Sequence, residues 1–223
     1  MSRLASFAAL ILTITATIAS AQVTSSSFST GGVARSSASG RGNVRLNASA
    51  AATNGGYARA TMNGSGLNGG RATGSSTALS NGGMAISNGS SHARGWNARS
   101  NADSFAVADR GIAISNAGAR ARGNGFANSQ SGAIGINGVA ISGSQANARG
   151  YFGGRGVANS SSLAIGQNGV GVSQSMSTAN GYFGGTAISN AGAATLNNGY
   201  SGATSTSGAF GGYSYSEAYH IVP

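Results

Sequence analysis

The chain has 223 residues, among them 39 Gly, one Pro, no Cys and no Lys, and only 7% of its residues are charged. Thirteen Arg oppose three acids, which gives a formal net charge of +10, and bulky apolar residues are too scarce for a conventional Leu-rich core. Because three acids and two His leave little acid–base chemistry, and no Cys leaves no thiolate or disulfide, we expect no enzyme, cofactor, metal site or small-molecule substrate.

Residues 1–21 have the pattern of a signal peptide. Met1-Ser2-Arg3 supplies a positive start, and Leu4–Ile18 is mostly apolar. Ala19-Ser20-Ala21 then fits the small-x-small cleavage rule, with Gln22 as the new terminus. The apolar stretch covers about 15 residues, which is shorter than the roughly 20 residues of a membrane-spanning helix. We therefore predict a secreted protein, extracellular or at the cell surface, and not an integral membrane protein.

Residues 31–212 form a degenerate repeat, preceded by a lead segment at 22–30 and followed by an aromatic tail at 213–223. The segments Ala133–Ser142 and Ala164–Ser173 share the pattern Ala-Ile-Gly-x-Asn-Gly-Val, and two Gly-Tyr-Phe-Gly-Gly motifs are separated by the same offset as these segments. An apolar residue after a glycine marks each copy: Val33, Tyr57, Met84, Ile112, Val139, Val170 and Tyr200. The gaps between successive markers, from roughly 24 to roughly 31 residues, are typical of stacked repeats. This spacing predicts about seven units, with the tail as a cap.

Alternation within the units predicts β-strands. Ile112-Ala113-Ile114 and Val139-Ala140-Ile141 place β-branched residues two apart on one strand face, and ten Asn-Gly pairs indicate tight turns. The fold class is therefore all-β, a low-complexity β-solenoid or stacked cross-β array rich in Gly, Ser, Asn and Ala. We expect six β-branched residues to pack inward as the stacking core: Ile112, Ile114, Val139, Ile141, Val170 and Val172. The alternative is a chain that is largely disordered until it assembles.

Two repeat segments resemble bacterial surface proteins. Ala164–Ser173 resembles the strand-and-turn units in the heads of trimeric autotransporter adhesins, which are β-rolls. Gln167–Gln174 is similar to the Gln/Asn–Gly repeats of curlin-type functional amyloid subunits. Both resemblances imply a secreted structural or adhesive role.

The arginines are distributed unevenly. Apart from Arg3, all lie between Arg35 and Arg155, and residues 156–223 contain none. Such a cationic region predicts contact with an acidic polysaccharide, a lipopolysaccharide or a nucleic acid, and the alternative is a solubilising charge that prevents premature association of strand edges. The candidate contact residues are Arg94, Arg99, Arg110, Arg120, Arg122, Arg149 and Arg155.

These observations favour a secreted, non-enzymatic structural or adhesive protein of the cell surface or extracellular matrix. It would associate with itself, as a homo-oligomer or fibre, through stacked β-repeats. The alternative function is an Arg-rich module that binds an acidic polymer. A minor alternative is an ice-binding solenoid with flat Thr, Ser and Asn faces.

Overall fold

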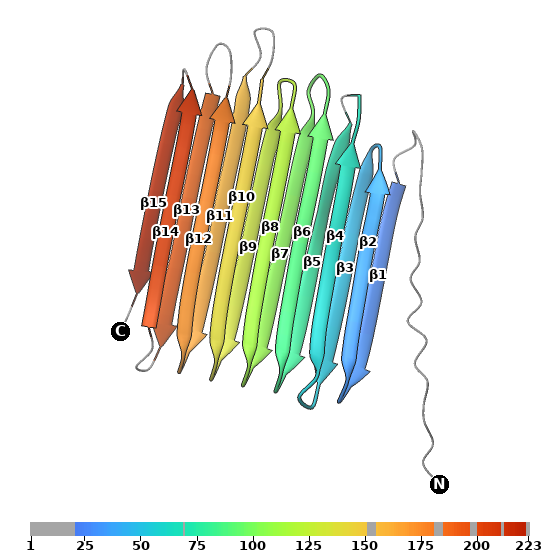
Figure 1. Ribbon diagram of the computed structural model, residues 1–223, viewed down its shortest axis with the longest axis vertical. Coiled ribbons are helices and arrows are strands. Elements are labelled where there is room, and N and C mark those ends of the chain that lie inside the picture. Colours follow the sequence, from blue (N-terminus) through green and yellow to red (C-terminus); the bar gives the residue numbers. More distant parts are fainter. Residues whose placement is uncertain are drawn as a thin grey trace.

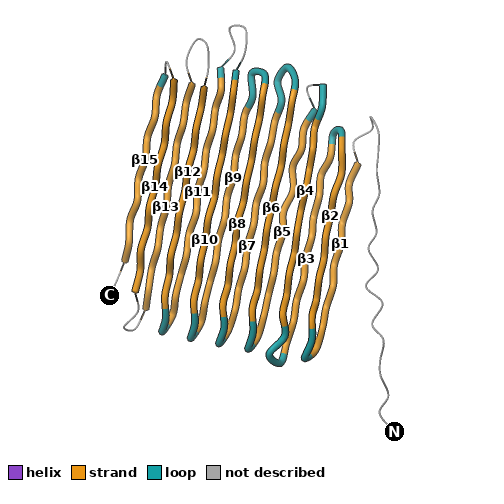
Figure 2. The backbone as a smooth tube through the Cα atoms, viewed as in Figure 1, coloured by secondary structure: helices purple, strands orange, loops and turns teal. Residues whose placement is uncertain are grey.

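The computed structural model describes residues 21–68, 70–150, 155–180, 185–196, 200–210 and 212–221. Within these residues the chain forms strands joined by short turns, and no helix (Figure 2). The strands are β1 (Ala21–Thr30), β2 (Val33–Arg41), β3 (Val44–Thr53), β4 (Tyr57–Gly66), β5 (Arg71–Asn81), β6 (Met84–Arg94), β7 (Arg99–Asp109), β8 (Ile112–Arg122), β9 (Phe126–Ile136), β10 (Val139–Arg149), β11 (Gly156–Gln167), β12 (Val170–Asn180), β13 (Gly185–Leu196), β14 (Tyr200–Phe210) and β15 (Tyr213–Ile221).

Successive strands alternate between two sheets that lie face to face, and the strands within each sheet run parallel to one another (Figure 1). The odd-numbered strands form an eight-stranded sheet, and the even-numbered strands form a seven-stranded sheet. The predicted β-solenoid is confirmed, and the repeat spacing is the strand register. The seven repeat markers occupy one column of the seven-stranded sheet, from Val33 beside Tyr57 to Val170 beside Tyr200.

The core between the sheets is made of small side chains. Buried and more exposed residues alternate along the strands, and the buried positions are mostly Ala, Ser and Gly. Leu46 and Met62 are the largest fully buried side chains among the described residues. Glycines make room for them, because a Cβ at residue 64 would lie 3.3 Å from Leu46 Cδ1, and one at residue 74 would lie 2.8 Å from Met62 Sδ.

Serine hydroxyls connect the two sheets through this core. Four of these bonds join a serine of the eight-stranded sheet to the serine eleven residues later, in the seven-stranded sheet. The Oγ–Oγ distance is 2.8 Å for Ser76–Ser87 and for Ser104–Ser115, and 2.7 Å for Ser162–Ser173. Ser131 and Ser142 form a fourth bond of the same kind. Buried hydroxyls therefore satisfy one another and hold the sheets close together.

The expected inward packing of the β-branched residues is wrong. Ile112, Ile114, Val139, Ile141, Val170 and Val172 stack in two adjacent columns, but those columns lie on the outer face of the seven-stranded sheet. Ile141 and Val172 are each 38% exposed. The physical reason is the separation of the sheets. Where two serine side chains already span the gap, there is no volume for an isoleucine.

The Asn-Gly pairs divide into turns and strand positions. Asn54, Asn68, Asn124, Asn137 and Asn168 have positive φ between 46° and 56° and lie in turns, as predicted. Asn81 ends β5, and the next residue, Gly82, takes a φ of 76°. The turns predicted at Asn63 and Asn88 are wrong, because both residues lie inside strands and the glycines that follow them are buried or half-buried. Asn180 ends β12, whereas Asn198 lies outside the described residues.

Both flanking segments belong to the sheets. All of the lead segment at 22–30 lies in β1, which pairs with β3, and most of the tail at 213–223 is β15, which pairs with β13. Residues 1–20 of the signal peptide lie outside the described residues, whereas Ala21 at the expected cleavage site begins β1. The two Gly-Tyr-Phe-Gly-Gly motifs are also largely outside the described residues, at 151–154 and 181–184.

Candidate functional site

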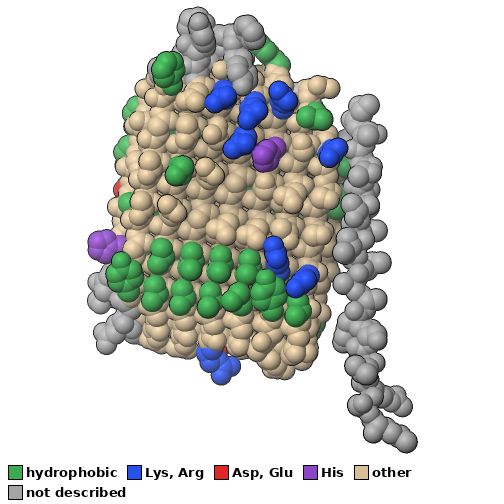
Figure 3. Space-filling view, in the orientation of Figure 1, with side chains coloured by type: hydrophobic (Ala, Val, Ile, Leu, Met, Phe, Trp, Pro, Cys, Tyr) green, Lys and Arg blue, Asp and Glu red, His purple; other side chains and the backbone are tan. Residues whose placement is uncertain are grey.

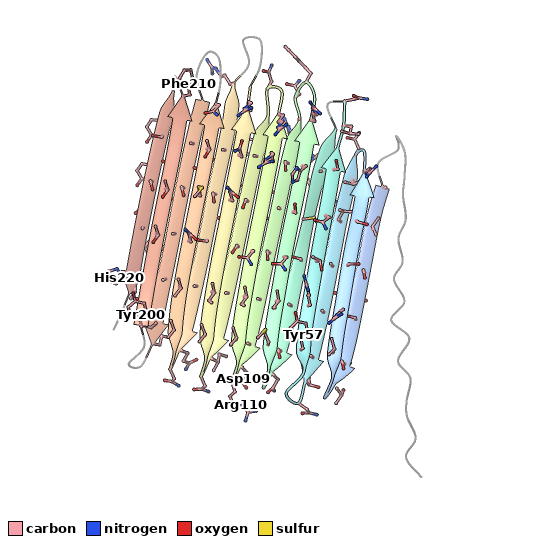
Figure 4. The ribbon with its side chains drawn as sticks, in the orientation of Figure 1. Tyr57, Asp109, Arg110, Tyr200, Phe210 and His220 are labelled. Atoms are coloured by element: carbon pink, nitrogen blue, oxygen red, sulfur yellow. The ribbon has the colours of Figure 1, made fainter. Side chains whose placement is uncertain are left out.

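A band of apolar side chains runs along the outer faces of both sheets, next to one turn edge of the solenoid. At this edge the odd-numbered strands end and the even-numbered strands begin. Tyr57, Asp109, Arg110 and Tyr200 lie near this edge in Figure 4. In Figure 3 the half of the band on the seven-stranded sheet appears as two rows of hydrophobic side chains. The band comprises Val33, Tyr57, Met84, Ile86, Ile112, Ile114, Val139, Ile141, Val170, Val172 and Tyr200 on that sheet, and Phe28, Leu79, Val107, Ile134, Ile165 and Ile221 on the other.

The band is a surface feature and not a second core. Phe28 is 68% exposed, Val33 58%, Tyr200 67% and Ile221 56%, and these are the band residues in the strands nearest the ends. Residues in the middle strands are about half-buried, because each one is flanked by equivalent side chains from the strands before and after it. A continuous apolar stripe of this kind on an outer face is typical of a surface that contacts another molecule.

A cationic cluster occupies the opposite edge of the seven-stranded sheet. Arg94, Arg122 and Arg149 occupy one register column at the ends of β6, β8 and β10. Arg41, His92 and Arg120 occupy the column two residues earlier in these even strands, with Ser65 between Arg41 and His92. The cluster and the band are separate on this face (Figure 3). Adjacent strands are about 4.8 Å apart, so the arginine column repels itself unless an anion neutralises it.

Two hollows meet at His92 within this cluster. One, with a volume of about 270 Å³, is lined by Leu67, Arg94, Arg120 and Arg122 together with small residues. The other, of about 560 Å³, is lined by Arg41, Asn63 and Ser and Gly residues, and Ser65 and His92 line both. We call the two together the cationic groove. Partial burial lowers the pKa of His92, and the nearby charges of Arg120 and Arg122 lower it further.

Arg149 belongs to the cationic cluster next to the groove, and the remaining candidate arginines lie outside both. Arg99 begins β7 in the eight-stranded sheet, and Arg155 precedes β11, so both are at the same turn edge as the groove but not among its lining residues. Arg110 is at the opposite edge, where its Nε lies 3.6 Å from Asp109 Oδ2. Thus the structure brings together Arg94, Arg120, Arg122 and Arg149 of the seven candidates. Arg41 and His92 also belong to this cluster, although no sequence pattern indicated them as contact residues.

No acid lies near the groove in the described part of the chain. Asp103 and Glu217 occupy one outer column of the eight-stranded sheet, and Asp109 ends β7 at the opposite edge. Burial raises the pKa of Asp103, although a 3.1 Å hydrogen bond donated by Asn101 opposes that shift. The described residues contain no group of three or more His, Asp or Glu that could hold a metal ion. None of the described segments forms an apolar helix of membrane-spanning length.

The end strand β15 differs from every other strand. All nine of its residues are exposed, on both faces. Its inner-face residues Ser214 and Ser216 pair with Ala187 and Ser189 of β13, which are both fully buried. On the outer face, Tyr219 covers Gly192, where an added Cβ would clash with the tyrosine ring. The inner face of β15 therefore continues the core columns, with β14 of the facing sheet on one side of it and no described strand on the other.

Comparison with known proteins gives no relative for this chain: no protein-family model, curated protein or solved structure matches it.

Proposed function

We propose that this β-solenoid is a secreted, non-enzymatic structural or adhesive protein whose copies associate through their end strands into a fibre or surface layer. The observation that carries the proposal is β15, whose inner face is exposed although the same columns are buried in β13. The inner-face residues of β15 are Ser214, Ser216, Ala218 and His220, and the first three match a facing strand of the same small-residue kind. A second copy of the chain supplies such a strand.

The two sheets end at different positions along the solenoid axis. This difference restricts how two copies can pack end to end. The eight-stranded sheet holds both β1 and β15, so it projects one strand beyond the seven-stranded sheet at each end. Copies stacked head to tail would pair β15 with β1 but leave a one-strand gap between β14 and β2. That gap would expose buried columns and backbone groups, which costs free energy.

A twofold axis parallel to the strands removes the gap. This axis places the eight-stranded sheet of one copy in line with the seven-stranded sheet of the other copy. Then β15 of each copy lies beside β14 of the other copy, and the inner face of β15 points toward the shared core. Because β14 and β15 run in opposite directions, the two new strand pairs are antiparallel (Figure 1). The β1–β2 end has the same stepped arrangement. Twofold contacts at alternate ends would therefore extend the dimer into a fibre.

A charge on the inner face of β15 tests the proposal. In the isolated chain Ser216 is exposed, so Ser216→Lys is expected to leave the fold intact but to prevent a second copy from covering the strand. Glu217→Gln is the matched control, because it makes the same change in net charge on the outer face of the same strand. Sedimentation velocity and negative-stain electron microscopy are expected to show dimers or fibres for the wild type and the control, and monomers for Ser216→Lys.

Two results would overturn the proposal. Monomers of the wild-type protein at all concentrations would exclude assembly through the ends, and unchanged assembly of Ser216→Lys would exclude β15 as the contact. Secretion is tested separately by N-terminal sequencing of the exported chain, which is expected to begin at Gln22. A chain that keeps residues 1–21, or that stays inside the cell, would contradict secretion.

A further inference from the structure

We propose that the cationic groove is a binding site for an extended acidic polysaccharide, whose carboxylate or sulfate groups contact the arginines of successive strands. The polymer would lie along the solenoid axis, across β2 to β10. This site is separate from the end strands and from the apolar band, so the inference goes beyond the proposed assembly and does not depend on it.

The charge arrangement favours a linear polyanion. Arg94, Arg122 and Arg149 form a row with a repeat of about 4.8 Å, and Arg41 and Arg120 lie in the neighbouring column. Among the described residues, the one ion pair joins Arg110 to Asp109, at the other edge. The groove therefore holds several guanidinium groups without a protein counter-charge. Guanidinium groups bind carboxylate and sulfate oxygens through paired N–H donors.

The groove floor favours a polysaccharide over a nucleic acid. Its lining residues are Gly40, Gly64, Gly66, Ser39, Ser65, Ser90, Asn63 and Ala93, beside Leu67 and the cationic side chains. The hydroxyl and amide groups suit the hydroxyls of a sugar chain. His92 is the one aromatic residue among these lining residues, and no Phe, Tyr or Trp accompanies it, whereas single-stranded nucleic acids are bound by stacking of successive bases on several aromatic side chains.

His92 makes the site sensitive to pH. Its charged neighbours are Arg94 on β6 and Arg120 and Arg122 on β8, and the facing residue of β4 is the neutral Ser65. Partial burial, and then the charges of Arg120 and Arg122, lower the pKa of His92 and favour its neutral form in the empty groove. A bound anion opposes these effects and favours protonation. Binding is therefore linked to proton uptake, and affinity is expected to increase as the pH falls through the pKa of His92.

The experiment measures binding of the purified protein to polygalacturonate and to dextran sulfate, with neutral dextran as the negative control. Affinity is expected to decrease steeply with salt. The double variant Arg94→Gln/Arg122→Gln is expected to weaken binding by about tenfold or more and to reduce the salt dependence by about one to two charges. The matched control is Arg35→Gln/Arg59→Gln, which removes the same charge from the same sheet face, at the edge that carries the apolar band. Its affinity is expected to remain within about twofold of wild type.

A second measurement tests His92. Wild-type affinity is expected to increase between about pH 7.5 and about pH 5.5, and His92→Asn is expected to abolish that increase. The affinities of the wild-type groove and of His92→Asn are also measured in proteins that carry Ser216→Lys. Because Ser216→Lys is expected to prevent assembly, this comparison separates binding at the groove from avidity in an assembled fibre. Equal losses in the two arginine double variants would overturn the site in favour of a nonspecific charge effect. Tighter groove-dependent binding of a single-stranded oligonucleotide would overturn the polysaccharide, and absence of binding at low salt would overturn both.

Discussion

Gly138→Ala tests the closeness of the turns at the apolar edge. Gly138 precedes β10, next to Gly111, whose carbonyl oxygen accepts a 3.0 Å hydrogen bond from the backbone N–H of Val139. A Cβ at residue 138 would lie far inside van der Waals contact with that oxygen. The same clash would arise at Gly83 and Gly169, so the requirement repeats from turn to turn. Alanine can be accommodated only by moving the turn away from its neighbour and weakening the hydrogen bond.

The expected loss is about 2 kcal/mol in the free energy of unfolding. Overpacking costs about 1–3 kcal/mol and the weakened hydrogen bond about 1 kcal/mol, while restriction of the unfolded chain returns about 0.4–1 kcal/mol. Urea unfolding followed by circular dichroism measures it. Gly118→Ala is the control, because the nearest atom to its added Cβ is 3.9 Å away, and it is expected to be neutral or slightly stabilising. Equal stability of Gly138→Ala and wild type, or equal losses in both variants, would refute the reasoning.

Two further predictions concern buried polar groups. Ser87→Ala removes the hydrogen-bond partner of Ser76 and Ser104, and it is expected to lower the free energy of unfolding by about 1–3 kcal/mol. The control Ser90→Ala, on the outer face of the same strand, is expected to change this free energy little. If Ser87→Ala leaves the free energy of unfolding unchanged, the serine hydrogen bonds do not stabilise the contact between the sheets. Burial raises the pKa of Asp103 above its unfolded value, so stability is greatest below the unfolded pKa and decreases as the pH rises through the folded pKa. Asp103→Asn is expected to flatten this dependence in melting curves from about pH 3 to about pH 7, and an unchanged profile would assign it to another group.

The repeat was predictable from the sequence because its physical cause is local. The five markers from Tyr57 to Val170 each follow a glycine whose missing Cβ lets adjacent turns approach, as at Gly111 and Gly138. A residue required at every turn produces a sequence period, and that period survives even where the strand residues vary. The offset between Ala133 and Ala164 is accordingly a strand register, in which these two residues are neighbours.

The direction of the strand faces was not predictable from hydrophobicity. Along Val139-Ala140-Ile141 both faces are apolar, and period-two alternation does not say which face is covered. The usual preference for bulky residues in the core assigns Val139 and Ile141 inward, whereas the structure buries Ala140. A signal for the correct choice was present in the serines eleven residues apart, such as Ser131 and Ser142, because two strands of one turn bring such a pair face to face.

The cationic groove was predictable only in part. Arg120 and Arg122 alternate with alanines, so the strand period places both on one face, and their charge assigns that face to the outside. Arg41 and His92 were not selected, because isolated basic residues in different strands form no local motif. Only the register brings them into one column with Arg120, through pairings between the even strands of successive turns. Sites of this kind in repeat proteins become visible once sequence positions are aligned by strand column.

The separation of the band from the groove allows two contacts on one molecule. Along β6, β8 and β10, the first residues belong to the apolar band and the last residue is an arginine, so a contact at one edge leaves the other accessible (Figure 3). Lateral packing of fibres through the apolar band would place the arginine rows of neighbouring fibres far apart. Mutual repulsion of those rows opposes any closer arrangement at low salt. In the proposed layer, an acidic polymer bound in the groove would remove that repulsion, and polymer binding would then increase the density of the layer.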